Sequence, residues 1–524
     1  MSGIEISKKI ILINSLSSAI SLLLSMSVLV WLQQYLLKHI SASEYSLIPI
    51  VLSAMAFAPL MTTVLTGGLS RFVTVAYAKN DLEQINTICS TMFPILFLAG
   101  IVFLIVGWWI AWNIDTFLVI APQYLLDAKI MLALMVFSTA VRLPLTVFLS
   151  GFMVRQKLVW QDLIDITCNL FRIALLFCLL FGLSAKALWV TVALVCSELL
   201  NLAISTPISL KLLPAQKVSF RKFKKTLAKE ITAFGSWWFV GSLADVIKKA
   251  MDPLILNRFS TAFEVTVFYV SDLVPRTMIQ ILMPISKPFF PILAGMVATQ
   301  DNVRLRNTYT RTARYHTWIV LMIAVPVVCF STELMHLYLN GQYDKAGGVM
   351  AILMGVTIMN ALNALGAAVA LASGDMRGLS LRVIFIQITN LLLTFLFVVR
   401  YEQGAYGSAY ASIIAVVILD VTLKWPFCRR LAHTPFIYWF KECLIPTFIP
   451  ALPALLFCLF VKSEYDIDSW VKLISVSALS AFVYIVFIVK FGLRTQDKMD
   501  LMRMSQIDKV PEPMKKVLKL LAKS

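Results

Sequence analysis

Residues 159 to 182 read VWQDLIDITCNLFRIALLFCLLFG, an apolar stretch with polar residues at regular intervals. The stretch exceeds the ~20 residues that cross a ~30 Å hydrocarbon core. In lipid such a segment is a helix, because a helix satisfies its own backbone hydrogen bonds. Asp162, Asp165, Asn169 and Arg172 fall at positions i, i+3, i+7 and i+10, which share one helical face. The stretch therefore predicts a membrane-spanning helix with one polar face.

Comparable stretches recur along the whole chain. Of 524 residues, 59% are hydrophobic and 14% are charged, against roughly 45–50% and about 25% in ordinary globular proteins. This composition excludes soluble enzymes, nucleic-acid-binding proteins and disulfide scaffolds. It predicts an all-α polytopic membrane protein of about 14 transmembrane helices, near 10 to 37, 46 to 77, 86 to 112, 127 to 153, 159 to 182, 187 to 210, 231 to 257, 265 to 297, 315 to 331, 347 to 373, 378 to 399, 406 to 427, 435 to 461 and 469 to 491.

The basic residues predict the orientation of these helices. With a cytoplasmic N-terminus, the inner loops and tails hold 27 Lys and Arg residues and the outer loops hold six. Positive charge accumulates on the cytoplasmic side of membrane proteins. Both termini are therefore expected in the cytoplasm. Most of the net charge of +18 is then a topology signal, and it indicates no nucleic-acid partner.

An internal repeat appears at a separation of about 221 residues. Ser150-Gly151 matches Ser373-Gly374, and Glu198 matches Asp420. The repeat predicts two six-helix lobes of equal orientation, related by a pseudo-twofold axis along the membrane normal. The expected organisation is a first lobe at 1–210, a basic cytoplasmic linker at 211–230, a second lobe at 231–430, two extra C-terminal helices at 431–492, and a basic cytoplasmic tail with an amphipathic helix at 493–524.

Several charges lie where lipid is expected. Burying one costs about 2.5–3.5 kcal/mol on insertion scales, so such residues face a partner or a water-filled cavity. In the seventh predicted span, Asp245, Lys248, Lys249 and Asp252 share one face, and Asp272 and Arg276 form an i,i+4 pair in the eighth. We expect a hydrated cavity between the lobes. The alternative is that these residues form ion pairs between helices, with long side chains reaching the interface at the ends.

Two sets of residues are candidates for the cavity. Cations for substrate binding are Arg71, Arg142, Arg172, Lys248, Lys249, Arg276 and Lys287. Acids for ion coupling are Asp165, Glu198, Asp245, Asp252 and Asp272. If Arg71, Arg142, Arg276 and Lys287 share one chamber, the deeply placed cations outnumber the charges that neighbouring acids neutralise. Such an excess of positive charge favours an anionic substrate. The guanidinium fork of arginine suits phosphate oxygens. The cysteines and histidines lack ligand spacing, so we expect no metal site. We also expect no cofactor and no catalytic residues.

Several longer segments resemble a known family. They are 234–301 (FGSWWFVGSLADVIKKAMDPLILNRF and onward), 338–346 (YLNGQYDKA), 371–377 (LASGDMR), 404–411 (GAYGSAYA) and 66–71 (TGGLSR). Together they resemble the polysaccharide transporter branch of the MOP superfamily, the Wzx-type flippases, which are related to multidrug MATE antiporters and the lipid II flippase MurJ. The resemblance covers essentially the whole chain and contains no catalytic signature.

The resemblance implies a pair of six-helix lobes around a cationic central cavity. It implies that the protein flips an undecaprenyl-diphosphate-linked oligosaccharide, for O-antigen, capsule or exopolysaccharide, from the cytoplasmic to the periplasmic leaflet of the bacterial inner membrane by alternating access. It also implies contact with membrane lipids, a possible polysaccharide polymerase and chain-length regulator, and coupling to a proton or sodium ion. The two extra helices resemble the pair that forms a groove for the lipid tail in the lipid II flippase.

Other functional classes remain open. A MATE-like drug or cation antiporter shares the lobes but would favour acids and aromatics in its chamber. A membrane glycosyltransferase or polymerase would be expected to carry a large outer loop with catalytic side chains, and the predicted outer loops are short. A sugar-uptake carrier agrees with the helix count.

Overall fold

The computed structural model describes residues 32–56, 69–78, 81–155, 157–286, 289, 293, 296–297, 299–495, 497–499 and 502. Within these ranges the described elements are helices, so the all-helical fold class is confirmed. The chain divides into two compact units. Unit 1 comprises Met1–Tyr269 and Leu391–Ala405, and unit 2 comprises Val270–Asn390 and Tyr406–Ser524.

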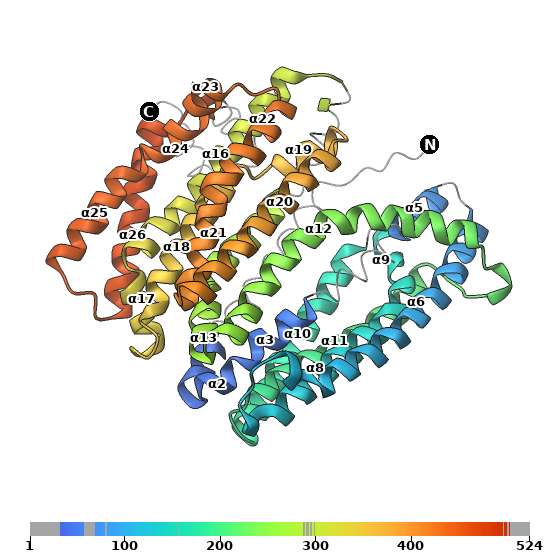
Figure 1. Cartoon of the computed structure of the whole chain (residues 1–524). Helices are drawn as coiled ribbons and strands as arrows, with labels where there is room; N and C mark the ends of the chain where they lie inside the picture. The colour runs from blue at the N-terminus through green and yellow to red at the C-terminus, as the bar shows by residue number, and fades with distance from the viewer. Residues whose placement is uncertain are drawn as a thin grey trace. The chain divides into compact units, whose positions relative to one another are not determined.

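Unit 1 is built around a group of long antiparallel helices. Its helices are α2 (Ala42–Tyr45), α3 (Leu47–Met55), α5 (Leu69–Ala78), α6 (Leu82–Trp112), α7 (Ile114–Phe117), α8 (Leu125–Leu145), α9 (Ser150–Val154), α10 (Leu158–Gly182), α11 (Ala187–Leu212), α12 (Lys225–Phe259) and most of α13 (Ala262–Ser271), with 3₁₀ turns at Pro122–Tyr124, Thr146–Leu149 and Phe220–Lys222. Helices α6 and α8 pack side by side, as do α8 and α11, and α10 and α11 (Figure 1).

Unit 2 has α16 at its centre. Its helices are α14 (Leu273–Ser286), α16 (Asn302–Cys329), α17 (Ser331–Leu339), α18 (Lys345–Ala361), α19 (Gly366–Ala372), most of α20 (Met376–Phe395), α21 (Gly404–Ile414), α22 (Trp425–Leu431), α23 (Phe436–Trp439), α24 (Ile445–Phe448), α25 (Ala451–Glu464) and α26 (Trp470–Phe487). Among the described residues of this unit, π-helical segments at Ala415–Lys424, Phe440–Leu444 and Ile488–Gly492 continue the α-helices beside them, and a further segment at Leu396–Arg400 follows α20 within unit 1. Helix α16 packs against α18, α25 and α26, which places its buried face in the core of the unit.

Several helix starts follow from local sequence. The side chain of Asp81 accepts a hydrogen bond from the backbone N–H of Gln84 at 2.8 Å at the start of α6. Asp301 does the same for Arg304 at 3.1 Å at the start of α16. These acids satisfy N–H groups that have no partner within the helix. Both helices therefore begin where the sequence places a capping acid.

Ten helices within the described residues are long and apolar enough to cross a membrane. They are Leu82–Trp112, Pro122–Phe152, Trp160–Gly182, Ala187–Leu212, Asn302–Cys329, Lys345–Ala372, Arg377–Arg400, Gly404–Leu431, Phe436–Glu464 and Trp470–Gly492. They coincide with ten of the fourteen predicted spans, and the chain is a multi-pass membrane protein.

The other four predicted spans have different outcomes. Most of 10 to 37 and part of 46 to 77 lie outside the described residues, as does much of the end of 265 to 297. The span 231 to 257 lies within α12, which carries Asp245, Lys248, Lys249 and Asp252. The number fourteen remains a prediction, and so do the lobe boundaries.

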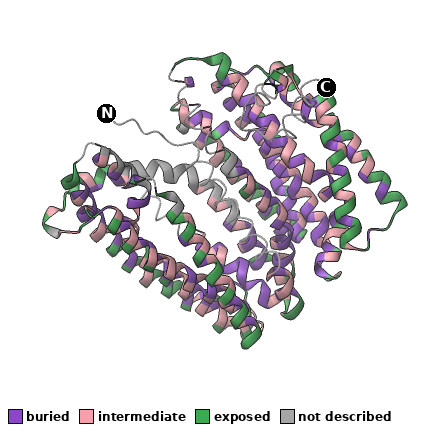
Figure 2. Cartoon of the chain, turned by 180° about the vertical axis from the view of Figure 1, so that it is seen from behind, coloured by how far each residue is buried: buried purple, intermediate pink, exposed green. Residues whose placement is uncertain are grey.

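The outer faces of the long helices carry large apolar side chains. Ile105 and Trp112 of α6 are exposed, and so are Phe460 of α25 and Val471 of α26. Figure 2 shows exposed residues along the sides of these helices that face away from each unit's core. In water such continuous apolar surface would be unfavourable. These faces are therefore the surfaces that contact lipid.

The segment predicted as a basic linker is bound to α6. The backbone N–H of Ser219 donates to the hydroxyl of Ser90 at 2.8 Å, and Lys222 forms an ion pair with Glu83 at 3.0 Å. The side chain of Asn86 donates to the carbonyl oxygen of Lys217 at 3.1 Å. These contacts fix the path of the chain before α12 begins at Lys225. Most of the tail at 493–524, in which an amphipathic helix is predicted, lies outside the described residues.

Candidate functional site

A polar cavity of about 440 Å³ lies in unit 1 between α8, α10 and α11. Its polar lining comes from all three helices and includes Arg142, Asp165, Asn169, Arg172, Glu198 and Asn201. The structure thus brings together four of the predicted site residues, Arg142, Arg172, Asp165 and Glu198, which are spread over more than 50 residues of sequence.

The residues of each helix reach the cavity because of their spacing. On α10, Asp165, Asn169 and Arg172 lie three or four positions apart and therefore share one face. On α11, Glu198 and Asn201 are separated by three positions in the same way. Because α10 and α11 pack along their lengths, the two polar faces meet. The cavity is the result of two matched polar faces on neighbouring helices.

Both acids of the cavity accept hydrogen bonds from neutral side chains. The hydroxyl of Ser138 on α8 donates to Oε2 of Glu198 at 2.5 Å. The amide of Asn201 donates from Nδ2 to Oδ1 of Asp165 at 2.7 Å. Hydrogen bonds to a carboxylate stabilise its charged form. Neutral side chains therefore hold both acids in place, and the cavity arginines act on them only over distances longer than an ion pair.

The two arginines are the unusual feature of the cavity. Among the residues that the structure describes, neither Arg142 nor Arg172 has a carboxylate within ion-pair distance or a side-chain hydrogen bond. Glu198 acts on Arg172 only through longer-range attraction. A guanidinium group offers five N–H donors in a fork that matches phosphate and carboxylate oxygens. The cavity therefore presents unused donors to an anionic group.

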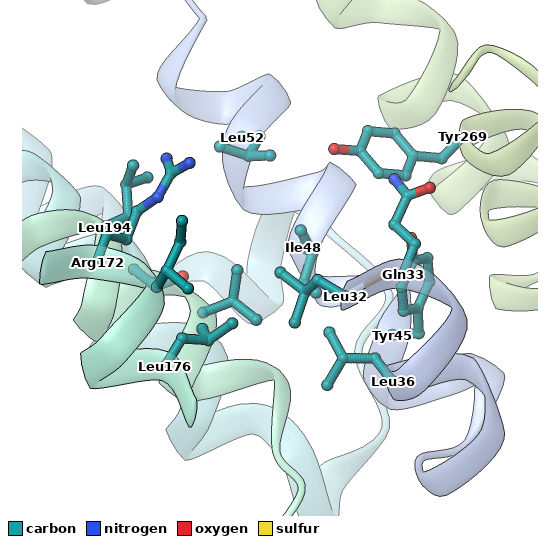
Figure 3. Close-up of a pocket in the computed structure, with 13 residues that line it drawn as sticks. Leu32, Gln33, Leu36, Tyr45, Ile48, Leu52, Arg172, Leu176, Leu194 and Tyr269 are labelled. Atoms are coloured by element: carbon teal, nitrogen blue, oxygen red, sulfur yellow. The ribbon is translucent and has the colours of Figure 1, made fainter. Parts of the chain in front are cut away.

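An apolar pocket of about 230 Å³ adjoins this cavity within unit 1. It lies between α10 and α11 on one side and residues 32–36, α2, α3 and Tyr269 on the other. Arg172 and Leu194 line both spaces. In Figure 3 the polar ends of Arg172 and Tyr269 point inward from opposite sides of the pocket, while Leu36, Ile48 and Leu176 fill its apolar wall. Arg172 therefore stands where a polar space changes to an apolar one.

Two other predicted residues form a pair in unit 2. Nε of Arg276 lies 3.3 Å from Oδ2 of Asp272, one turn earlier in the chain, and both side chains are partly exposed. This is the i,i+4 pair that the sequence predicts. Neither residue is among the lining residues described for the unit 1 cavity.

Asp252 is buried in α12, with 5% of its surface exposed. The hydroxyl of Thr394 donates to Oδ1 of Asp252 at 3.2 Å, and this contact joins α12 to the end of α20 within unit 1. A hydroxyl beside a buried carboxylate supplies an oxygen pair suited to a proton or a small cation. The contact is compatible with the coupling role that the sequence analysis gives to Asp252.

The remaining predicted residues fall outside what the structure describes. Lys287 and the side chains of Arg71, Asp245, Lys248 and Lys249 lie outside the described part of the structure. The proposal that Arg71, Arg142, Arg276 and Lys287 share one chamber therefore stays a prediction.

Sequence reasoning missed the neutral partners of the cavity. Asn201 and Ser205 follow Glu198 at i+3 and i+7, which is the same helical signal that identified α10. Ser138 carries no comparable signal, because its partner Glu198 lies on another helix. Tyr269 lies within the family-like segment 234–301, and its place at the apolar pocket follows from the fold.

A comparison with protein-family models matches residues 36–347 to a family described as "Polysaccharide biosynthesis protein". The chain belongs to this polysaccharide biosynthesis family. The match covers more than half of the chain and includes all four predicted residues that line the unit 1 cavity.

Similarity to individual proteins extends over nearly the whole chain. It is 20% identical to the "Uncharacterized membrane protein EpsK" of Bacillus subtilis (strain 168) over 484 residues, covering 91% of this chain and 94% of that protein. The structure of the lipid II flippase MurJ in an inward closed conformation is similar with a TM-score of 0.69 and 14% identity, covering 92% of this chain and 98% of the other.

A multidrug resistance MATE transporter of the MOP superfamily, in an inward-facing conformation, is similar with a TM-score of 0.67 and 11% identity. That likeness covers 79% of this chain and 94% of the transporter. At these identities the likenesses establish the fold. The polysaccharide biosynthesis chain therefore has the fold of MOP-superfamily transporters.

Proposed function

We propose that this protein flips an undecaprenyl-diphosphate-linked oligosaccharide from the cytoplasmic to the periplasmic leaflet of a bacterial inner membrane by alternating access. The observation that carries the proposal is the pair of arginines, Arg142 and Arg172, that line a polar cavity without a carboxylate partner among the described residues. The family match and the transporter fold support the same class of function.

The chemistry of the substrate explains why such a cavity is needed. A diphosphate and several sugars cannot cross hydrocarbon unaided, because removing charges and hydroxyls from water is very unfavourable. Arg142 and Arg172 supply donors for phosphate oxygens, and Asn169 and Asn201 supply hydrogen bonds suited to sugar hydroxyls. No covalent bond is made or broken in this function, so we assign no catalytic residue.

The acids of unit 1 have a separate role in this proposal. Asp165, Glu198 and Asp252 are proposed to exchange a proton or sodium ion as the protein changes state, together with the predicted Asp245 and Asp272. The hydrogen bonds to Asp165, Glu198 and Asp252 support the proposal because each one positions a carboxylate through a neutral donor. We also propose that both termini are cytoplasmic and that a polymerase and a chain-length regulator receive the product.

A MATE-like antiporter is the second candidate function. The observation that favours it is the presence of Asp165 and Glu198 in the same cavity as the arginines, because carboxylates attract cationic drugs. The hydrogen-bond pattern favours the flippase, since the acids have partners while the arginines have none among the described residues. A single experiment separates the two.

Purified protein in liposomes provides that test. We expect it to flip a fluorescently labelled undecaprenyl-diphosphate oligosaccharide, and the double variant Arg142→Gln/Arg172→Gln to reduce the rate at least tenfold. Lysine at both positions should restore part of the rate, because charge remains while the planar fork is lost. Arg258→Gln, at an exposed arginine at the end of α12, is the matched control and should behave as the wild type.

Two results would contradict the flippase. One is a normal flipping rate in the Arg142→Gln/Arg172→Gln variant at normal abundance. The other is a wild-type protein that exchanges ethidium for protons and leaves the labelled lipid in its original leaflet, which would assign the protein to the antiporter class.

A further inference from the structure

We propose that the apolar pocket beside Arg172 binds the isoprenoid segment nearest the diphosphate of the transported lipid. The proposal rests on the flippase function above and adds a specific subsite for the lipid. In this proposal unit 1 binds both parts of the substrate. The phosphates lie in the polar cavity, and the first part of the isoprenoid chain lies in the pocket.

The two spaces follow one another along the same pair of helices. On α10, the polar cavity is lined from Gln161 to Arg172, and the apolar pocket from Arg172 to Leu176. On the antiparallel α11, the pocket is lined from Val190 to Leu194 and the cavity from Leu194 onward. An α-helix rises about 1.5 Å per residue, so the change from polar to apolar occurs within about one turn. A linear amphipathic molecule with a phosphate at its junction fits this order.

The lining of the pocket selects an apolar chain. Leu36, Ile48 and Leu176 form its wall, and Arg172 supplies the formal charge among its described lining residues. A sugar would leave its hydroxyls without partners along this wall, which is unfavourable. An inorganic anion would contact Arg172 and gain nothing from the rest of the pocket. At about 230 Å³ the pocket holds a short chain segment, and the remainder of the lipid stays in the membrane.

A buried polar atom marks the same pocket as a binding space. Gln33 is 4% exposed, and its Oε1 has no hydrogen-bond partner within the described part of the chain. In Figure 3 its amide lies next to Tyr269 at the edge of the pocket. An unsatisfied buried acceptor is uncommon in folded proteins. A water at the edge of the pocket would satisfy this acceptor and leave the apolar wall free for the chain.

The predicted membrane orientation agrees with this assignment. With a cytoplasmic N-terminus, α10 runs outward from Leu158, so the polar cavity lies on the cytoplasmic side of Arg172 and the apolar pocket on the outer side. A lipid of the cytoplasmic leaflet has its headgroup on the inner side and its chain directed toward the middle of the bilayer. The order of the two spaces is therefore that of a substrate entering from the cytoplasmic leaflet.

The test compares two ligands that differ only in the chain. Full-length protein in phosphatidylcholine nanodiscs is titrated with farnesyl diphosphate and with inorganic diphosphate, with empty nanodiscs as the blank. Leu52→Trp places an indole in the pocket from α3, and Leu32→Trp does so from a different segment in case the first variant folds poorly. Leu456→Trp, at a lipid-facing position that is 65% exposed, is the matched control.

We expect both pocket variants to weaken farnesyl diphosphate binding at least tenfold and to leave inorganic diphosphate binding within twofold of the wild type. Arg172→Gln should weaken both ligands, and Leu456→Trp neither. Unchanged farnesyl diphosphate affinity in both correctly folded pocket variants would overturn the subsite and leave the proposed flippase function standing. A wild-type protein that binds neither ligand would overturn the diphosphate site itself.

A photoreactive probe locates the chain directly. A farnesyl diphosphate analogue with a diazirine on its first isoprene unit should label peptides of α3 and α10, and Leu52→Trp should reduce this labelling severalfold. Labelling confined to other helices, identified by mass spectrometry, would overturn the assignment.

Discussion

The carboxylate of Glu264 accepts a hydrogen bond from the backbone N–H of Ala405 at 2.7 Å, close to the start of α21. Glu44 accepts one from the backbone N–H of Ala187 at 3.0 Å, at the start of α11. The two acids are separated by about 220 residues. The backbone N–H of Glu44 donates a hydrogen bond to the hydroxyl of Ser41, and the backbone N–H of Glu264 donates one to the hydroxyl of Thr261. The two contacts fix the starts of two helices in the same way, at about the separation of the predicted repeat.

Removing these acids should destabilise the protein. Each carboxylate satisfies an N–H group that lacks a partner within its helix and lies at the positive end of the helix dipole. We expect Glu264→Ala and Glu44→Ala to lose ~1–3 kcal/mol each, and the Gln variants to lose less because an acceptor oxygen remains. Thermal unfolding in detergent measures the effect. Glu464→Ala, at an exposed acid, should melt with the wild type, and identical melting of Glu264→Ala would contradict the prediction.

A buried ion pair in unit 2 should be more sensitive to single substitutions. Arg314 and Asp497 form an ion pair with 1% and 2% of their side chains exposed, and Nη1 of Arg314 donates to the carbonyl oxygen of Glu442 at 2.6 Å. Asp497→Ala should lower the free energy of unfolding by about 3–5 kcal/mol, because it removes the carboxylate nearest to the buried Arg314 and leaves only Glu442, at 3.7 Å, within ion-pair distance. The measurement is thermal unfolding, together with protease sensitivity of the segment after residue 493.

The matched control is Asp468→Ala, which removes an exposed ion pair with Lys472 and should have little effect. The double variant Arg314→Met/Asp497→Leu should be more stable than Asp497→Ala, because neither charge remains. Equal stability of the wild type and Asp497→Ala would show that the pair contributes little.

The predicted orientation can be tested by labelling single cysteines. Gln342 lies in an expected outer loop and Arg221 in an expected cytoplasmic segment, and both are exposed. In a variant whose exposed Cys178 is replaced by Ser, Gln342→Cys should react with an impermeant maleimide in intact cells. Arg221→Cys should react only after permeabilisation. The opposite pattern would reject cytoplasmic termini.

Energy coupling predicts a response to ion gradients. An ion that crosses the membrane with the substrate cycle contributes about 2.3 kcal/mol per charge per 100 mV. We expect a proton, sodium or voltage gradient to accelerate flipping in proteoliposomes. Asp165→Asn, Glu198→Gln or Asp252→Asn should reduce that acceleration, with a smaller effect on the flipping rate measured without a gradient.

Thr394→Val is the companion to Asp252→Asn, since it removes the hydroxyl that donates to Asp252 and leaves the carboxylate in place. Equal rates under every gradient in the wild type would eliminate coupling. Acceleration that survives in all three acid variants would move the coupling site to other residues.

The sequence alone predicted the properties that depend on local composition and periodicity. Apolar length identified ten of the helices that the structure shows, because crossing hydrocarbon requires a fixed number of apolar residues whatever the neighbours are. The spacing of Asp165, Asn169 and Arg172 identified a polar face on α10, because the period of a helix is the same in every context.

Only the tertiary structure decided which polar groups meet. Arg314 lies just before the span predicted at 315 to 331, which places it in a loop, yet the structure buries it against Asp497, because α16 begins at Asn302 and extends past it. Ser138 binds Glu198 from another helix, and Tyr269 reaches the pocket beside Arg172 from α13. Such partners are separated by tens of residues in the chain, and their contacts depend on how helices pack, which no local pattern of residues specifies.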